Sequence, residues 1–459
     1  MASEELQPKE SRTSIPVPKA PQQSLDEVPE GGFRAWTVVA GSSATMFCTF
    51  GYLTGFGYVL ALLDDSSILN MDMALFSQPY EDHLRSDANP PLLSIYQSWY
   101  AEHQLSSYTM SDISWIGSVQ IFLNFSIGLG GGPLMDRFGT VAFIPASLVY
   151  VVSLVLTSLC KEYYQFFLAQ AVLGGISLGV LFNIALSIIG HYFVRRQGLA
   201  QGIIMAGAAL GGVIFPVALN RMLNDIGLSF GWSVRVCALI IFVLLALAAP
   251  TMRTRLPPSR SKMDYSLMRR PVYILIAAGG WLLNWGMYVP LFYLPPFSIA
   301  AGLDAEMAPY TVAIFNAVSL FGRVMAGTLA DGLGRFNVVI LNGFLCALMQ
   351  FVWPATNSPA GVYCVTVFSG LFIGSIVSLQ ATIVADITPE PKYIGSMMGI
   401  TMAIWACGGL TGPPIAGAIL NINGSYNDPA LFAGASLVAG SLMFLAARLM
   451  TEKKVLVRM

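Results

Sequence analysis

The chain has 459 residues, of which 55% are hydrophobic and 11% charged, with a formal net charge of −1. Soluble domains carry about 25% charged residues, so this composition and a mean hydropathy of +0.65 argue against a soluble protein and indicate a membrane protein. The near-zero charge gives no general attraction to nucleic acid. The six cysteines are scattered singly through hydrophobic segments. We therefore expect free thiols and neither a metal site nor a cofactor.

Twelve segments along the chain are long and apolar enough to be transmembrane helices. Crossing the hydrocarbon core takes about 20 helical residues. Segments of this kind begin near Trp36, Ile113, Val141, Gln165, Leu199, Ser233, Pro271, Ala308, Asn337, Ala360, Ile394 and Pro429. The preceding residues, 1–35, are polar and contain prolines, which predicts a disordered cytoplasmic tail rather than a cleaved signal peptide. The sequence thus predicts an all-α membrane protein with twelve transmembrane helices.

Lysine and arginine residues lie mainly in the even-numbered connections between these segments and after the last one. The opposite connections hold only Arg85, Lys161 and Arg221. Since basic loops stay in the cytoplasm, both termini are predicted to be cytoplasmic, including a short tail over 451–459. The basic stretch 252–270 is predicted to be a cytoplasmic linker between two six-helix halves, 36–251 and 271–450. The plasma membrane is the expected location, with the vacuolar membrane as the alternative.

An acidic insertion of nearly fifty residues, 64–112, separates the first two predicted spans. The orientation places it outside the cell as an extracellular loop. The overlapping stretch 58–95 interrupts a helix end, which leaves a second interpretation open: this stretch is a retained intron in the gene sequence.

The two halves share an internal repeat. The loop Gly132-Pro-Leu-Met-Asp136 corresponds to Gly327-Thr-Leu-Ala-Asp331, 195 positions later. Gly175 and Gly179 correspond to Gly370 and Gly374 at the same offset, in the fourth and tenth spans. Small residues four apart allow close helix packing, and transporters with repeats rock one repeat against the other. The prediction is two six-helix pseudo-repeats that alternate access to a central site.

The repeated loops supply the candidate gating residues. An aspartate can accept hydrogen bonds at a helix N-terminus, and the arginine can pair with a carboxylate on a neighbouring helix. Ordinary loop capping is the alternative. The predicted gating set is Gly132, Asp136, Arg137, Gly139, Asp331, Gly334, Arg335, Arg195 and Arg196.

The paired loops resemble the signature of the major facilitator superfamily. The segments Glu30–Trp36 and Tyr192–Gly202, the latter completed by Ala206-Gly207, further resemble the first- and fifth-helix signatures of monocarboxylate porters and their fungal relatives. Ile204 departs from the fifth-helix signature. The resemblance covers nearly the whole chain. It implies twelve helices, cytoplasmic termini and transport of a small solute.

Two ionisable groups of the carboxylate-carrying members are missing. Their first-helix lysine falls near Thr54, and the aspartate four residues before Arg323 is replaced by Ser319. By this resemblance, proton-coupled transport of simple monocarboxylates is disfavoured and a larger metabolite is favoured.

Arg323 is the strongest candidate for contact with the solute. It lies in the middle of the eighth span, where an ionised group is costly and normally faces a cavity or a partner. With Asn316, Ser319 and Gly327 it forms a row on one helical face, in which neighbouring members are three or four residues apart. The alternative is that Arg323 pairs with an acid or with backbone carbonyls and only fixes helix packing.

Other polar residues in the spans complete the candidate site. The seventh span carries Asn284, Trp285 and Tyr288, a face that can stack on a ring-bearing solute. Asn183 of the fourth span is added as a further candidate. Core packing and interhelical hydrogen bonds are the alternatives for all four.

No nucleophile–base arrangement or phosphate loop supports an enzyme or an ATP-driven pump. The leading hypothesis is a secondary active transporter of a small organic solute, with an organic anion or carboxylate as the favoured class. Its expected partners are the lipid bilayer, the solute and a coupling proton. Two alternatives stay open: an exporter of a larger neutral secondary metabolite, and a solute sensor that does not transport.

Overall fold

The computed structural model describes residues 31–53, 100, 104–105, 108, 110–127, 139–193, 195–255, 265–304, 307, 310–356, 358–390, 393–423 and 425–451. Their regular secondary structure is entirely helical. The helices of the first half are α1 (Phe33–Met46), continued by the π-helix Phe47–Gly51, α4 (Met110–Ser126), α6 (Phe143–Thr157), α7 (Tyr163–Phe166), continued by the π-helix Phe167–Gly174 and α8 (Gly175–Ser187), α9 (Gln197–Asn220) and α10 (Phe230–Ala248). Those of the second half are α11 (Pro271–Ala300), α12 (Tyr310–Leu333), α13 (Arg335–Val352), α14 (Pro359–Ile387), α15 (Ile394–Asn423) and α16 (Asn427–Thr451).

Nine of the described helical segments are long and apolar enough to cross a membrane. The continuous helix 33–53, α4 and α12 bring the number of membrane-spanning helices in the described residues to twelve. Helices are the natural choice here because a lipid environment leaves no water to satisfy backbone groups. Local sequence sets several boundaries: Pro359 starts α14 after Ser358, whose hydroxyl accepts a hydrogen bond from the Gly361 amide. Each of these twelve helices begins within three residues of its predicted start. The predicted fold class is confirmed.

The outer surface is apolar, as lipid contact requires. Large hydrophobic side chains are exposed along the outward faces of the helices, for example Leu239 at 63% and Leu247 at 67% on α10. A soluble monomer rarely shows apolar patches of this extent. The surface therefore fits the hydrocarbon core of a bilayer.

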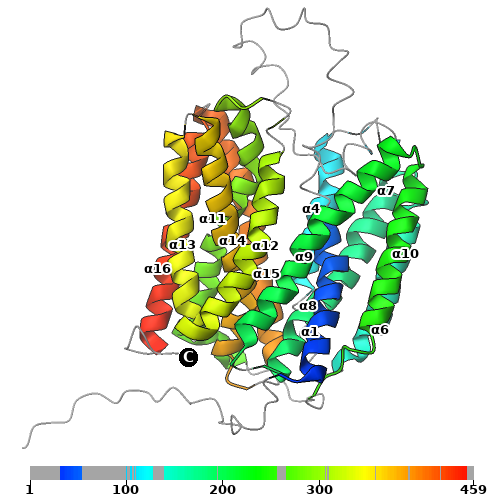
Figure 1. The fold of residues 1–459 in the computed structure, drawn as a ribbon, viewed down its shortest axis with the longest axis horizontal. Coiled ribbons are helices and arrows are strands. Elements are labelled where there is room, and N and C mark those ends of the chain that lie inside the picture. The colour runs from blue at the N-terminus through cyan, green and yellow to red at the C-terminus, as the bar shows by residue number, and fades with distance from the viewer. Residues whose placement is uncertain are drawn as a thin grey trace, which may run out of the picture.

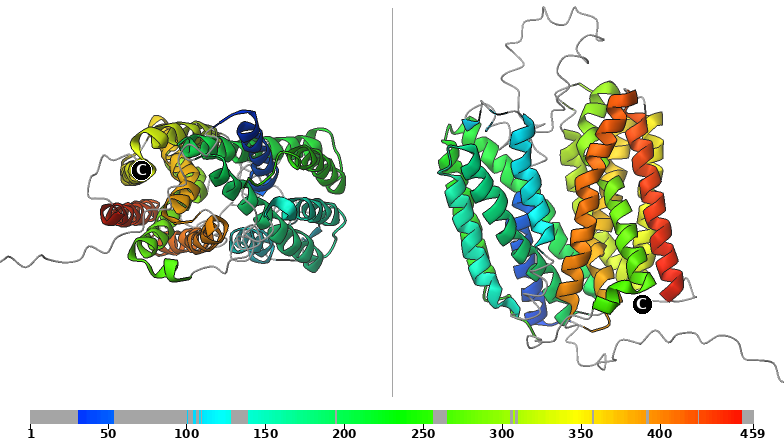
Figure 2. Two further views of the ribbon diagram at one scale, coloured as in Figure 1. Left: turned by 90° about the horizontal axis from the view of Figure 1, so that it is seen from below. Right: turned by 180° about the vertical axis from the view of Figure 1, so that it is seen from behind.

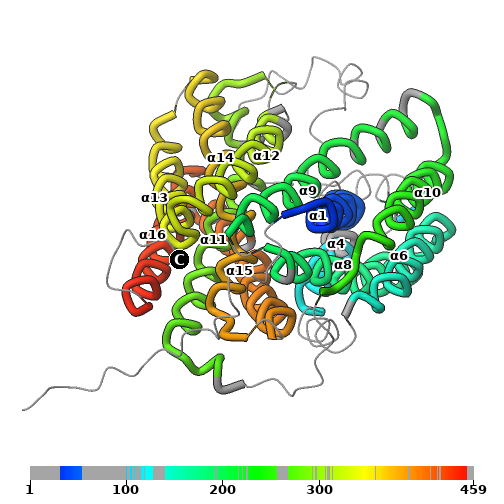
Figure 3. Tube along the Cα trace, turned by 60° about the horizontal axis from the view of Figure 1, so that its bottom comes forward, coloured from blue at the N-terminus to red at the C-terminus, as the bar shows by residue number. Residues whose placement is uncertain are grey.

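The helices form two bundles, one from α1 to α10 and the other from α11 to α16 (Figure 1). The end at which α1 begins and α16 ends is called the terminal face below. The bundles lie close together at the terminal face and lean apart towards the opposite end, as both side views show (Figures 1 and 2). Contact between the bundles runs mainly through α9 with α12 and α14, and through α4 and α8 with α15. Figure 3 shows these helices grouped around the middle of the molecule.

The internal repeat appears as two equivalent sets of helix contacts. Gly175 and Gly179 of α8 face the backbone carbonyls of Gln120 and Asn124 on α4. Gly370 and Gly374 of α14 face those of Phe315 and Ser319 on α12. Each member of the second set lies 195 positions after its counterpart. The same small-residue packing thus joins the second helix to the fourth in both halves.

Three predicted segments fall largely outside the described residues. These are the tail 1–35, described only from residue 31, the insertion 64–112 with the overlapping stretch 58–95, and the tail 451–459, described only at residue 451. The linker 252–270 is described at its two ends, where Tyr265–Arg269 forms a 3₁₀ turn.

We expect Gly374→Val to destabilise the second bundle by about 1–3 kcal/mol, the usual cost of overpacking a tight interior. A Cβ atom at this position would collide with the backbone of Ser319. Thermal unfolding of the purified protein measures the effect. Gly332→Val is the matched control, because a Cβ there would meet nothing within 4 Å. Equal melting temperatures for the two variants would contradict the packing argument.

Candidate functional site

A two-part cavity lies between the bundles. The arginine lobe has a volume of about 650 Å³ including its open mouth, and the aromatic lobe has about 490 Å³. The arginine lobe is lined by Phe50, Ala208, Ala209, Gly212, Met287, Tyr288, Leu291, Phe315, Asn316, Ser319, Arg323, Ile373, Gly374 and Val377. The aromatic lobe is lined by Phe50, Phe125, Phe182, Met205, Asn284, Tyr288, Val377, Gln380, Met402, Trp405 and Ala406.

Arg323 lines the arginine lobe from the middle of α12. Its side chain is 9% exposed, and its Nη1 donates a hydrogen bond of 2.6 Å to the carbonyl of Met205 on α9. The guanidinium therefore links the two bundles while it faces the cavity. Asn316 and Ser319 line the same lobe, as the helical spacing predicts, and the Ser319 hydroxyl donates to the Asn316 carbonyl. The structure thus brings three predicted site residues together.

The predicted residues of α11 divide between the cavity and the bundle interior. Tyr288 lines both lobes, and Asn284 lines the aromatic lobe while its Nδ2 donates to the Gly280 carbonyl. Trp285 turns away from both lobes: its Nε1 donates 2.8 Å to Thr411 on α15 and its ring packs on Phe432. Its contacts are those of helix packing.

Asn183 is not part of the lining of either lobe. It is 1% exposed on α8, and its Nδ2 donates to the carbonyl of Gly179 in the same helix. Its described contacts match the packing alternative.

Most of the aromatic lobe was not anticipated from the sequence. Phe50, Phe125 and Phe182 come from three helices of the first bundle, and their ring centroids lie 5.4–5.9 Å apart. Trp405 of α15 forms part of the opposite wall. Phenylalanines occur in eleven of the twelve predicted spans, so no motif marked these rings. The π-helical register of Phe47–Gly51, which sets the direction of Phe50, has no clear sequence signal either.

The cavity is separated from the terminal face by direct backbone contact between α9 and α12. Gly198 and Gly202 of α9 face the carbonyls of Gly327 and Arg323 on α12. A side chain at any of the three glycines would collide with the other helix. In addition, the Asp331 carboxylate accepts hydrogen bonds of 2.8 and 2.9 Å from the backbone amides of Gly198 and Leu199. An acid of the second bundle thus caps the N-terminus of a first-bundle helix.

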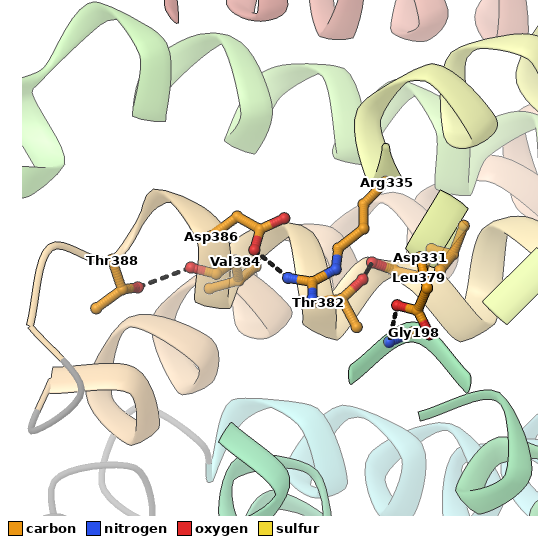
Figure 4. A network of polar contacts seen from close by, with 8 residues as sticks. All are labelled: Gly198, Asp331, Arg335, Leu379, Thr382, Val384, Asp386 and Thr388. Carbon is orange, nitrogen blue, oxygen red and sulfur yellow. Dashed lines mark hydrogen bonds and ion pairs between the residues drawn. The ribbon is translucent and has the colours of Figure 1, made fainter. Parts of the chain in front are cut away.

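A second ionic contact stabilises this end of the second bundle. Arg335, at the start of α13, pairs with Asp386 near the end of α14, and both side chains are largely buried, at 7% and 17% exposure. Figure 4 shows this pair beside Asp331 and Gly198. Gly334 separates α12 from α13 with a φ of +90°, a conformation that glycine adopts without strain. The repeated loop predicted a carboxylate partner for Arg335 without identifying Asp386.

The remaining gating candidates divide between described and undescribed segments. Arg195 and Arg196 are exposed just before α9, and Gly139 starts the 3₁₀ turn that precedes α6. Gly132, Asp136 and Arg137 lie outside the described residues. Among the described residues, no three histidine, cysteine or acidic side chains gather as metal ligands.

Comparison with known proteins places the chain among transporters. The sequence profile of the Major Facilitator Superfamily matches residues 46–390. The aspyridones efflux protein apdF of Emericella nidulans is 37% identical over 95% of this chain and 81% of its own length. The agnestins efflux protein AgnL12 of Paecilomyces divaricatus is 34% identical over 100% of this chain and 96% of its own.

A solved structure has the same fold. The transporter FucP, in the outward conformation, superimposes with a TM-score of 0.64 at 14% identity, covering 91% of this chain and 98% of FucP. This likeness concerns the fold alone. Together with the family profile and the fungal relatives, it identifies the chain as a multi-pass integral membrane protein that belongs to the Major Facilitator Superfamily.

Proposed function

We propose that this transporter exports a largely apolar organic secondary metabolite by alternating access. The observation that carries the proposal is the cavity between the bundles, whose lining is mostly aromatic and aliphatic. Apolar walls with a few placed polar groups favour a solute larger and less polar than a short-chain carboxylate. The names of two fungal relatives, efflux proteins for aspyridones and agnestins, support the same direction of transport and the same class of solute.

This proposal revises the leading sequence-based hypothesis towards its first alternative. Within the described lining, Arg323 is the single charged side chain, which suits one acidic or electron-rich group on the solute. Ser319 stands where carboxylate carriers have an aspartate, so the lining does not reproduce their pair. A coupling proton stays a prediction. No observation favours the sensor alternative.

The basic connections give the proposed orientation, with the terminal face in the cytoplasm and the plasma membrane as the location. In this orientation the structure is closed to the cytoplasm by the α9–α12 contact. The bundles lean apart on the extracellular side (Figure 1). For an exporter, this is the conformation that releases the solute outside. The return to the loading state requires that α9 and α12 separate.

The Asp331 cap is proposed to be the latch of this closed state. Hydrogen bonds from backbone amides to a carboxylate are charge-assisted and stronger than neutral ones. They join one bundle to the other through Gly198 and Leu199. The Arg335–Asp386 pair, by contrast, lies within the second bundle. It is proposed to hold the last turn of α12, which carries Asp331, in position.

Efflux from fungal cells tests the function. Cells that express the protein are expected to retain less of at least one apolar metabolite, from a panel that includes aspyridones and agnestins, than cells with an empty vector. Arg323→Met should reduce the efflux rate about tenfold or more, since hydrogen bonds to charged groups contribute about 1.5–3 kcal/mol.

The control for this experiment is Arg235→Met, the same substitution outside the cavity. Arg235 lies near the start of α10, where it donates a hydrogen bond to the Ser158 hydroxyl and lies over the Trp232 ring. This variant should export at the wild-type rate. Equal retention of every compound with and without the protein would contradict the proposed export.

Removal of the cap should open the terminal face. Asp331→Ala loses two charge-assisted hydrogen bonds between the bundles, so the population open to the terminal face is expected to rise by about tenfold or more. The reporter is a cysteine at Met205, 3% exposed, in a background without other cysteines. A membrane-impermeant maleimide applied to inside-out vesicles should label it faster in the variant. Unchanged labelling would show that Asp331 is not the latch.

A further inference from the structure

The aromatic lobe has the construction of a ring-binding site. Phe50 packs at 5.9 Å from Phe125 and 5.6 Å from Phe182, in edge-to-face and tilted arrangements. Phe50 and Phe125 are only partly buried, so part of their surface stays available to a solute. Aromatic pairs in such geometries attract one another beyond the burial of their area. A planar ring that enters the lobe would extend this cluster.

Contacts behind the lining residues fix the walls of the aromatic lobe. The Trp405 Nε1 donates to the Ile276 carbonyl, and its ring lies so close to Gly280 that no larger residue fits there. On the other wall, Gly51 at the end of the π-helix packs directly on Gly211 of α9. π-Helical turns often occur at functional sites. Here the turn and its glycine contact position Phe50.

The two lobes are adjacent and differ in charge. Phe50, Tyr288 and Val377 line both of them, so these side chains form the boundary between the lobes. The arginine lobe offers the Arg323 guanidinium. In the described lining of the aromatic lobe, the amides of Asn284 and Gln380 are neutral. A solute that spans the boundary therefore meets a cation at one end and rings at the other.

We propose that the aromatic lobe recognises an aromatic or conjugated ring of the solute, while the acidic end of the same molecule lies at Arg323. The substrate class is thus a two-ended amphipathic acid with a planar ring, and ring recognition is the specificity step. This inference rests on the proposed function, because it describes what the exporter selects.

Paired probes test ring recognition directly. Calorimetric titration of the purified full chain in lipid nanodiscs compares 6-phenylhexanoate with 6-cyclohexylhexanoate, which has the same chain and acid but no aromatic ring. The wild type should bind the phenyl probe about two- to tenfold more tightly, the range of aromatic-pair energies. In Phe50→Leu/Phe125→Leu this ratio should fall to about one.

The matched control is Phe368→Leu on the outer surface of α14. Phe368 is 46% exposed and stacks on Phe372, so this variant loses a ring without touching either lobe and should keep the wild-type ratio. Retained binding of the cyclohexyl probe shows that the double variant is folded. If the double variant binds neither probe, Phe125→Leu alone is measured, and the ratio must fall there.

Three results would overturn the inference: equal binding of both probes by the wild type, no binding of either, or an unchanged ratio in the folded variants. The cellular efflux assay separates this failure from failure of the proposed function. Export without a ring preference would refute the aromatic lobe alone. A ring preference without export would refute the proposed function and keep the binding site.

Discussion

The arrangement of this transporter depends on the backbone contact between α9 and α12 at the terminal face. In lipid there is little hydrophobic drive for helices to associate, so close packing and polar contacts must hold the bundles together. Glycines at 198, 202 and 327 let the two backbones touch, and the Asp331 carboxylate accepts charge-assisted hydrogen bonds from the backbone amides of Gly198 and Leu199 at the start of α9.

The position and state of the cavity follow from this contact. The lining of the arginine lobe begins at Arg323, whose backbone carbonyl faces Gly202 in this contact and whose guanidinium donates to the Met205 carbonyl across the boundary between the bundles. The repeated glycine contacts inside each half keep α4 with α8, and α12 with α14, as rigid pairs. We therefore expect the proposed movement to take place between the bundles. A solute that attracts Arg323 competes with the Met205 carbonyl, and in this way binding can influence the equilibrium between the closed and open terminal face.

The sequence correctly predicts those features that depend on a single helix. Helix positions follow from the length of apolar segments, and the shared face of Asn316, Ser319 and Arg323 follows from helical spacing. It could not choose between Trp285 and Tyr288, three residues apart on α11, because that choice depends on where α15 packs. The aromatic lobe was inaccessible for the same reason: its rings come from separate helices, and a π-helical turn shifts the register of Phe50. Asp386 was likewise found only once α13 and α14 were placed side by side.

The rocking of one bundle against the other is tested most directly by two distances in the same protein. Spin labels at Arg196 and Gly332 report on the terminal face, and labels at Val213 and Ala317 report on the opposite end of α9 and α12; all four positions are exposed. Pulsed electron resonance would be recorded with and without a transported metabolite. Alternating access predicts that the two distances change in opposite directions, the first lengthening as the second shortens. A change at one end only, or in the same direction at both, would contradict the account.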